Sequence, residues 1–463
     1  MFWADKDRAE QFAKTNHSAE TQFSHVVDGM PLFFDTNLRP ITLGNRFFSE
    51  YTKLASKNSV KAYASDFLKF LRFANNQGID LVNAKLSDIT SYRVSRSKLG
   101  HSNATQVREM VIVREFYKFL LNTKSIDELP WITIGRTNSA IVKSKARGMR
   151  IRALTHDEWQ TFYDVGLGGN LPNGDLDPSF RGTNTLRDRL GAKLALTTGM
   201  RLREWRTLLT AEFESRLDSD GASFPIESMA KGEYRRTIYI PEDTLHDIEL
   251  YQSTERRRVV RKAQNSLRAN RHVLAEAINL DRLNHRITYR FNGSTFTYPL
   301  HRVPEQHRKV LVSVGSDSIE PLSLFVGRSG QALSERAWLA KFQDASRRVE
   351  GLVPQRASTK VTPHDLRHTF AVVLLRELQL LAAKKQTQRA NLGTGTIWEQ
   401  LAFNPLLVLQ RLLGHASPAT TAIYIHYIDD SLDVVNIAFE QWSNSDKDFA
   451  ELFLDTLEKW ENV

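Results

Sequence analysis

The chain has 463 residues, of which 41% are hydrophobic and 10% aromatic, so it can build the buried cores of two or three globular domains. Its 63 lysines and arginines outnumber 53 acidic residues, and the formal net charge of +10 favours a polyanionic partner such as nucleic acid. Cysteine is absent, which excludes disulfides, thiolate catalysis and cysteine-based zinc sites. We find no signal-peptide pattern and no apolar run near the ~20 residues of a membrane helix, so we expect a cytoplasmic protein without a membrane partner.

The first part of the chain divides into a leader and a helical domain. Residues 1–44 are a mixed leader, in which Pro31 to Phe34 form a candidate ordered piece that packs onto a later domain. Residues 45–127 read as an all-helical domain because apolar side chains recur at helical spacing. These are Val60, Tyr63, Phe67, Phe70 and Leu71 in one helix, and Val107, Met110, Val111, Phe116, Phe119 and Leu120 in another.

Residues 128–152 read as a basic linker. From Gly135 to Leu154 the sequence holds six basic residues and no acidic one, with Gly, Ser and Asn between them. A plain flexible linker is one interpretation. The one-sided charge favours a strand that runs along a phosphate backbone.

A second domain spans residues 153–430. Thr155 and Glu158 form a capping-box pattern that opens a helix. Residues 237–240 (TIYI) predict a short strand that ends at Pro241. Residues 255–271 carry seven basic residues and one acid on a predicted helix, and Asn292-Gly293 between two β-rich runs predicts a hairpin with a type I′ turn.

Residues 431–463 end the chain with an amphipathic helical pattern. Such a helix packs on its own domain or docks onto a neighbouring protomer, and both interpretations stay open here.

Three stretches carry side chains suited to phosphoryl chemistry. TTGMRLREW contains Arg201 shortly after a glycine, MAKGEYRRTIYIP places Lys231 on a predicted hairpin, and residues 362–427 run from TPHDLRHTF to LLGHASPATTAIYIHY. The last stretch contributes His364, Arg367, His415 and Tyr424. A phenol with two permanent cations suits attack of an oxygen nucleophile on a phosphodiester, whose charge guanidinium groups neutralise.

The chain resembles the tyrosine recombinases of the phage-integrase type. All six residues that the family uses are present in the family's order, with the tyrosine nine residues after the last histidine: Arg201, Lys231, His364, Arg367, His415 and Tyr424. The resemblance covers roughly residues 45–430 and is firm only around these motifs.

The resemblance implies a mainly α fold with a small antiparallel β-sheet. A helical core-binding (SAM-like) domain and an α+β catalytic domain would form a C-shaped clamp around double-stranded DNA. Relative to compact family members, residues 255–310 read as an insertion, which is either a surface elaboration or an extra contact to DNA or another subunit. Residues 384–404 read as a further insertion, which separates HDLRH from LLGH more widely than is usual. Candidate DNA contacts are Lys57, Lys61, Arg93 and Arg96 in the helical domain, each of which could equally belong to a solvated face, and Lys143, Lys145 and Arg147 in the linker.

The resemblance also implies roles for the six residues and the assembly. Tyr424 would attack the phosphorus and leave a 3′-phosphotyrosyl enzyme, with Arg201 and Arg367 neutralising the phosphoryl oxygens. His364 and His415 would donate hydrogen bonds, His364 could also accept the tyrosine proton, and Lys231 would protonate the leaving 5′ oxygen. No ATP, cofactor or metal would be needed. We expect a dimer on one DNA site and a tetramer on two, with possible accessory DNA-bending proteins, in a nucleoid-associated integrase of a mobile element.

Several alternatives accompany this hypothesis. Glu204 reads as an ion-pair partner of Arg201 or as a surface i,i+3 pair. His364 and His368 have the spacing of a helical zinc pair, but the general-base Glu is missing and Arg367 would repel a cation, so we expect no metal. Tyr424 alone would read as a core aromatic, and Trp205 reads as core. A type IB topoisomerase and a catalytically silent DNA-binding protein on the same fold are the rival functions.

Overall fold

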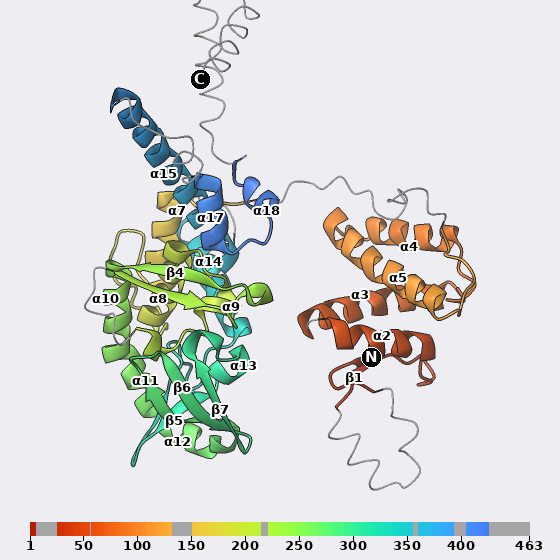
Figure 1. Ribbon diagram of the computed structural model, residues 1–463, viewed down its shortest axis with the longest axis horizontal. Helices are drawn as coiled ribbons and strands as arrows, with labels where there is room; N and C mark the ends of the chain where they lie inside the picture. Colours follow the sequence, from red (N-terminus) through yellow and green to blue (C-terminus); the bar gives the residue numbers. More distant parts are fainter. Residues whose placement is uncertain are drawn as a thin grey trace, which may run out of the picture. The chain divides into compact units, whose positions relative to one another are not determined.

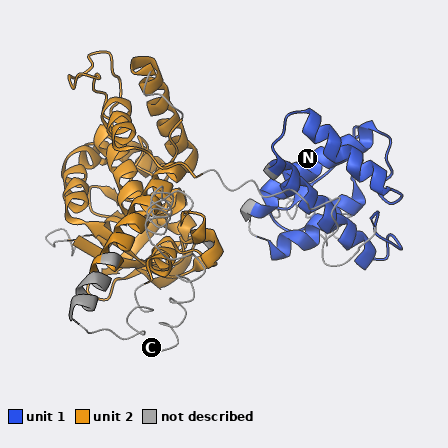
Figure 2. Ribbon diagram, turned by 90° about the horizontal axis from the view of Figure 1, so that it is seen from above, with its two compact units in different colours: residues 1–149 blue, residues 150–463 orange. Residues whose placement is uncertain are grey.

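The computed structural model describes residues 1–5, 26–55, 57–131, 151–213, 221–354, 360–392 and 404–425. The chain divides into two compact units, residues 1–149 and residues 150–463 (Figure 2). The C-shaped clamp around DNA, the contacts of the basic linker with phosphates and the helix predicted over residues 431–463 are not described by these ranges. All three stay predictions.

The first unit is the predicted helical domain. Its helices are α2 (Thr42–Leu54), α3 (Lys57–Asn76), α4 (Leu86–Lys98) and α5 (Asn103–Asn122). Phe48, Phe67 and Phe116 are buried between them, and Phe33 of the leader is buried against Phe48 and Phe67. Two short strands, β1 (Phe2–Trp3) and β2 (Pro31–Leu32), pair antiparallel beside this core. The ordered piece of the leader therefore packs onto the helical domain.

The second unit is mainly helical (Figure 1). Thr155 caps its first helix through a capping box with Glu158, as predicted. The helix continues into a π-helical turn over Thr161–Leu167. The helices in chain order are α7 (His156–Gln160), α8 (Thr185–Thr198), α9 (Leu202–Trp205), α10 (Glu242–Tyr251), α11 (Arg257–Lys262), α12 (Gln264–Ala269), α13 (Glu305–Arg308), α14 (Glu335–Leu352), α15 (Pro363–Leu392), α17 (Pro405–Leu413) and α18 (Pro418–Ala422).

Two sheets lie in the second unit. Strands β3 (Gly221–Ile226) and β4 (Arg236–Pro241) form the small antiparallel sheet, with Phe224 opposite Ile238. The segment read as an insertion contributes to a five-stranded sheet in the order β7-β6-β5-β8-β9. In it β5 and β8 pair parallel and the other neighbours antiparallel. Its strands are β5 (Ala275–Asp281), β6 (Arg286–Phe291), β7 (Ser294–Pro299), β8 (Leu311–Val314) and β9 (Ile319–Pro321).

The hairpin predicted at Asn292-Gly293 joins β6 to β7. Asn292 has a φ of 48° and Gly293 a φ of 77°. Positive φ at both central residues is what a type I′ turn requires, so this prediction is confirmed.

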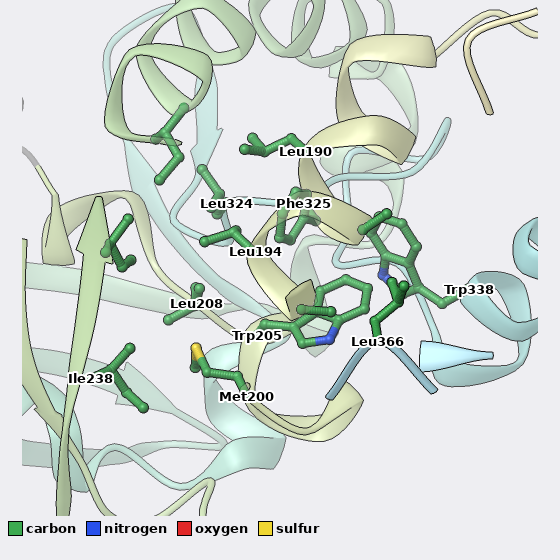
Figure 3. Close-up of a cluster of buried hydrophobic side chains, with 14 of the residues drawn as sticks. Leu190, Leu194, Met200, Trp205, Leu208, Ile238, Leu324, Phe325, Trp338 and Leu366 are labelled. Carbon is green, nitrogen blue, oxygen red and sulfur yellow. The ribbon is translucent and has the colours of Figure 1, made fainter. Parts of the chain in front are cut away.

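The main core of the second unit contains the residues that directly precede two predicted site arginines. Figure 3 shows Trp205 of α9 and Trp338 of α14 packed together with Phe325, and the two indole rings lie 4.6 Å apart edge to face. Met200 and Leu366 are fully buried in the same core. Because each directly precedes an arginine, the core fixes where the backbone presents Arg201 and Arg367. The interpretation of Trp205 as a core residue is confirmed.

Gly191 in α8 allows this close packing of tryptophans. A Cβ atom there would lie 2.5 Å from the Trp338 ring. We expect Gly191→Ala to lower the free energy of unfolding by about 1–3 kcal/mol, because the rigid indole has to move. Gly351→Ala in α14 is the matched control, since nothing lies within 4 Å of its added Cβ. Thermal and urea denaturation of both variants test this, and an unchanged Gly191→Ala midpoint would contradict it.

Candidate active site

The first turns of α15 place two predicted site residues, His364 and Arg367, beside a second imidazole, His368. The Thr362 N–H donates to Asp365 Oδ2 at 2.8 Å, and the Asp365 N–H donates to Thr362 Oγ1 at 3.3 Å. This reciprocal capping fixes where the helix begins. His364, Arg367 and His368 follow within one turn of each other, so they leave the helix on neighbouring positions.

Arg367 is a buried cation held by backbone carbonyls. Only 2% of the residue is exposed. Its Nη1 donates to the carbonyl of Gly199 at 2.5 Å, and its Nη2 donates to the carbonyl of Leu413 at 2.7 Å. Burial and the charge of Arg201 lower the pKa of Arg367 to about 9, so it remains charged at neutral pH. Among the described residues it forms no ion pair, and a buried charge without a counter-ion is costly.

Gly199 makes the first of these contacts possible. It ends α8 in the left-handed conformation, with a φ of 61°, and a Cβ there would lie 2.3 Å from the Phe370 ring. Only glycine fits such a position without strain. The turn therefore presents its carbonyl to Arg367 and leads directly into Arg201.

Arg201 is paired with a buried carboxylate. Its Nη1 lies 3.2 Å from Glu204 Oε1, and its backbone N–H donates to Glu204 Oε2 at 2.7 Å. Glu204 is fully buried. Burial alone would raise the pKa of Glu204, but the charges of Arg236, Arg367 and Arg201 outweigh it and the pKa is lowered. The ion-pair interpretation of Glu204 is confirmed, and the surface alternative is wrong.

Arg236 is a third guanidinium that the sequence analysis missed. It donates to both carboxylate oxygens of Glu204, at 3.0 and 2.5 Å, and to the carbonyl of Leu412 at 2.9 Å. A Cβ on Gly414 would lie 2.9 Å from the Arg236 side chain, so the left-handed glycine that ends α17 leaves room for it. Arg236 thereby joins strand β4, helix α9 and the end of α17.

His415 is a neutral imidazole whose tautomer follows from its partners. Its Nε2 lies 3.2 Å from Nη2 of Arg367, and its Nδ1 lies 2.9 Å from Thr421 Oγ1. Because a guanidinium donates only, Nε2 must accept, and Nδ1 carries the proton. Burial, then Arg367 and Arg201, lower the pKa of His415 to about 3. The sequence did not point to Thr421, which is buried and orients the ring.

Tyr424 lies in the same site, against an imidazole that we had considered only as a metal ligand. The residue is 1% exposed, and its Oη lies 2.9 Å from Nδ1 of His368, which is 3% exposed. Burial raises the pKa of Tyr424, partly offset by Arg367 and Arg201. The His415 ring lies parallel to the Tyr424 ring with centroids 6.3 Å apart.

His364 and Lys231 complete the predicted set. The His364 ring is exposed and packs against the His368 ring with centroids 4.2 Å apart. Although the residue is exposed, the protein atoms packed around one side of it desolvate the imidazole, and this desolvation, then the charge of Arg367, lower the pKa of His364. Lys231 begins a 3-10 turn over Lys231–Glu233, between β3 and β4, which matches the predicted hairpin. Its side chain lies outside the described atoms.

The electrostatics of the site favour an anion. Three guanidinium groups, from Arg201, Arg236 and Arg367, against one carboxylate, from Glu204, leave a net charge of +2 within the cluster. A phosphodiester carries one negative charge and gains another as a nucleophile adds to phosphorus, so this excess matches its transition state.

The DNA-contact candidates of the first unit divide by their partners. Lys61 is exposed on α3, and Arg93 is half-buried on α4. Arg96 is engaged inside its own domain, because its Nε and Nη2 donate to the buried Glu109 at 2.8 and 2.9 Å. This contact gives Arg96 a structural role inside its own domain. The side chain of Lys57, and the residues Lys143, Lys145 and Arg147, lie outside the described part.

Within the described ranges, we find no group of histidine and acidic side chains arranged to hold a metal ion. His368 directs its Nδ1 at Tyr424, so this nitrogen is engaged with a phenol. In the same ranges, no helix combines the length and apolar character needed to cross a membrane.

Comparisons with known proteins place the chain in a family. The sequence model described as phage integrase, N-terminal SAM-like domain, matches residues 45–124, and the model described as phage integrase family matches residues 176–383. The second range includes Arg201, Lys231, His364 and Arg367, whereas His415 and Tyr424 follow it.

Individual relatives agree with this match. Tyrosine recombinase XerC of Listeria monocytogenes serovar 1/2a is 22% identical over 383 residues, which cover 81% of this chain and 89% of the relative. Tyrosine recombinase XerD of Shewanella oneidensis is 22% identical over 377 residues, covering 81% and 88%. A relative from Caldanaerobacter subterraneus subsp. tengcongensis is 35% identical over 83 residues, which span 18% of this chain and 29% of its own length.

The fold agrees as well. The solved structure of the XerH site-specific recombinase, bound to a palindromic difH substrate after cleavage, superposes with a TM-score of 0.51 at 18% identity, covering 86% of this chain and 84% of that one. The predicted fold class is thus confirmed, with a helical N-terminal domain and a catalytic domain. The chain therefore belongs to the phage integrase family, the tyrosine recombinases, and is an enzyme of site-specific DNA recombination.

Proposed function

We propose that this protein cleaves and rejoins DNA through a covalent 3′-phosphotyrosyl intermediate on Tyr424. The observation that carries this proposal is Arg367, a buried guanidinium that makes no direct ion pair within the described ranges, in a site that also holds Arg201 and the phenol. An anion bound beside Arg367 would supply the missing charge. A phosphodiester is the anion that a phenol can attack.

The reaction follows from the chemistry of the groups. Oη of Tyr424 forms a bond to phosphorus while the bond to the 5′ oxygen breaks, so the 3′ phosphate becomes attached to the enzyme. Arg201 and Arg367 stabilise the charge that develops on the non-bridging oxygens. Lys231 protonates the 5′ oxygen as it leaves. A 5′ hydroxyl from another strand reverses the step, and the phosphotyrosine bond keeps the energy of the phosphodiester.

We further propose that Tyr424 attacks in the site of its own protomer. This is supported by its hydrogen bond to His368 and by the parallel packing of its ring on His415 of the same chain. Thr421, which bonds to His415, lies in the helix α18 that leads to Tyr424. A short segment thus joins the nucleophile to the phosphate-binding residues.

The experiment that tests the proposal traps the covalent intermediate. The protein is incubated with DNA that flanks its own gene, quenched in detergent, and the covalently attached DNA is sequenced. We expect adducts at a short discrete site, and we expect Tyr424→Phe to abolish them while it leaves DNA binding intact. Tyr427→Phe is the matched control, because it removes a phenol three residues away and should keep the adduct.

The other outcomes discriminate the rival functions. Adducts scattered over all fragments, with relaxation of any supercoiled plasmid, would indicate a topoisomerase. Tight binding without any adduct would indicate a catalytically silent DNA-binding protein. Adducts that persist in Tyr424→Phe would show that another residue is the nucleophile.

We propose integration or excision of a mobile element as the biological role, with a dimer on one DNA site and a tetramer on two. The adduct sequence tests the role, since a site at an element boundary supports it and a site shared by genomes without the element contradicts it. Sedimentation of the protein with one site and with a synapsed pair tests the assembly. Any DNA-bending partner would appear as a requirement for recombination but not for adduct formation.

A further inference from the structure

His368 contacts the nucleophile directly, although no role in the proposed reaction has yet been given to it. Its Nδ1 lies 2.9 Å from Oη of Tyr424, and both side chains are almost fully buried. We propose that His368 is the catalytic residue that accepts the phenolic proton when Tyr424 attacks DNA. This proposal rests on the proposed function. From the sequence, His364 was the candidate that could also accept this proton.

The direction of the hydrogen bond follows from the partners available. Among the described residues, Oη of Tyr424 has no other hydrogen-bond partner. If Nδ1 carried a proton and donated it, the buried phenolic O–H would lack an acceptor, which is costly. Nδ1 therefore accepts, and the imidazole is the neutral tautomer with its proton on Nε2. A phenol whose proton already points at a basic nitrogen is arranged for transfer.

The other two imidazoles are poorly placed for this transfer. His415 uses Nε2 to accept from Arg367 and Nδ1 to donate to Thr421, so neither nitrogen is available to the phenol. His364 has an exposed ring, and in the described part of the chain it makes no hydrogen bond to Tyr424. Its ring contact with His368 instead connects the buried imidazole to an exposed one.

The surroundings of His368 keep it neutral before DNA binds. Burial, then His364, lower the pKa of His368 to about 4. The titratable and charged groups that face it come from α15, from the segment after α18 and from the turn after α17: His364, Asp365, Arg367, Tyr424 and His415. A phosphodiester bound to the arginines would add negative charge beside these groups. The imidazole would then hold a proton more readily during attack than in the free protein.

The step balances in atoms and charge. The Oη–phosphorus bond forms and the bond from phosphorus to the 5′ oxygen breaks. The phenolic proton moves to Nδ1 of His368, which becomes imidazolium, while Lys231 gives a proton to the 5′ oxygen. Rejoining runs these transfers backwards, so the enzyme ends with the protons it began with.

The test measures adduct formation in a single turnover on the trapped site, as a function of pH. In His368→Asn the amide oxygen can still accept the hydrogen bond from Tyr424, but it cannot take up the proton. We expect the rate to fall by about 100-fold or more, and the acid limb of the pH profile to disappear. His364→Asn is the matched control, which we expect to keep that limb.

A second substrate separates the two proton transfers. With sulfur in place of the bridging 5′ oxygen, the leaving group needs no proton, so Lys231→Ala should regain most of its rate. His368→Asn should remain slow on this substrate, because its defect lies at the nucleophile. Rescue of His368→Asn by the sulfur substrate would place it on the leaving-group side and overturn the proposal.

Two further outcomes decide the matter. If His368→Asn forms adducts within about threefold of the unmodified protein and keeps the acid limb, His368 is only structural and the inference fails while the proposed function stands. If the unmodified protein forms no adduct at all, the proposed function fails, and the assignment fails with it.

A measurement on the unmodified protein does not depend on the variant folding. Nitrogen-15 spectra of labelled histidine report whether Nδ1 of His368 is unprotonated and whether its signal shifts in Tyr424→Phe. A protonated Nδ1 at neutral pH would overturn the proposal.

Discussion

Arg367→Lys is expected to slow covalent adduct formation by about 10³-fold, the largest loss we expect for a change that keeps the charge. The guanidinium reaches the carbonyls of Gly199 and Leu413 and Nε2 of His415 at once. An ammonium is a point charge without this planar fork, so it cannot keep those contacts and also meet two phosphoryl oxygens. Single-turnover kinetics on the trapped DNA site measure the loss.

The matched control for this variant is Arg347→Lys. Arg347 is exposed on α14 and pairs with Asp344 one turn earlier, so its exchange should leave the rate unchanged. A rate for Arg367→Lys within tenfold of the unmodified protein would mean that charge alone suffices at this position.

Arg367 also predicts a response of stability to anions. Burial lowers the pKa of Arg367 to about 9. At neutral pH the buried charge therefore lowers the free energy of unfolding, and this loss decreases as the pH rises above that value. Vanadate, which resembles the pentavalent transition state, should therefore raise the melting temperature of the protein. Arg367→Met should respond less, since it lacks the buried charge that the anion compensates.

Glu204→Gln is expected to lower the free energy of unfolding by about 3–5 kcal/mol. The fully buried carboxylate accepts two hydrogen bonds from Arg236, one from the side chain of Arg201 and one from its backbone N–H. A neutral amide would leave two guanidinium groups beside Arg367 without any negative charge. Urea denaturation measures the loss, and Glu350→Gln, on the exposed face of α14, is the control.

A double variant identifies the cause of this loss. Glu204→Leu with Arg236→Met replaces the pair by apolar groups of similar size, and we expect it to be more stable than Glu204→Leu alone. If the double variant and Glu204→Leu have the same free energy of unfolding, lost packing and not unpaired charge explains the loss of stability. Because the pKa of Glu204 is lowered, its contribution is full above its ordinary pKa and is lost as the pH falls through the lowered value.

Local sequence patterns predicted the frame of the site well. The glycine before Arg201, the capping signals at Thr155 and the strand that ends at Pro241 all follow from neighbours in the chain. The same holds for the turn at Asn292. Such signals depend on a few adjacent residues, so they can be recognised without knowledge of the rest of the fold.

Contacts between distant segments were harder to predict. The parallel pairing of β5 with β8 joins strands separated by the β6–β7 hairpin, and no local signal marks it. His368 reaches Tyr424 across 56 positions of sequence, so its role was hidden behind the zinc-like spacing to His364. Arg96 looked like a surface cation because its partner Glu109 lies on another helix.

Arg236 is the residue that the sequence could have revealed. Ile238 and Ile240 face inward from strand β4, and Arg236 has the same parity along the strand. A period of two therefore places its side chain on the buried face. A buried arginine requires a partner, and Glu204 was already a candidate ion-pair partner of Arg201.

The ion cluster around Glu204 also bears on how this enzyme tolerates change. Arg236 joins the strand after the Lys231 hairpin to the carboxylate behind Arg201 and to the Leu412 carbonyl before His415. Glu204 and Arg236, to which the proposed reaction gives no chemical step, therefore set the spacing among the residues that take part in it. Variants with altered DNA specificity should therefore be made by changing residues on the proposed DNA-binding surface. Strand β4, Glu204 and the end of α17 should be kept unchanged, because their positions depend on one another.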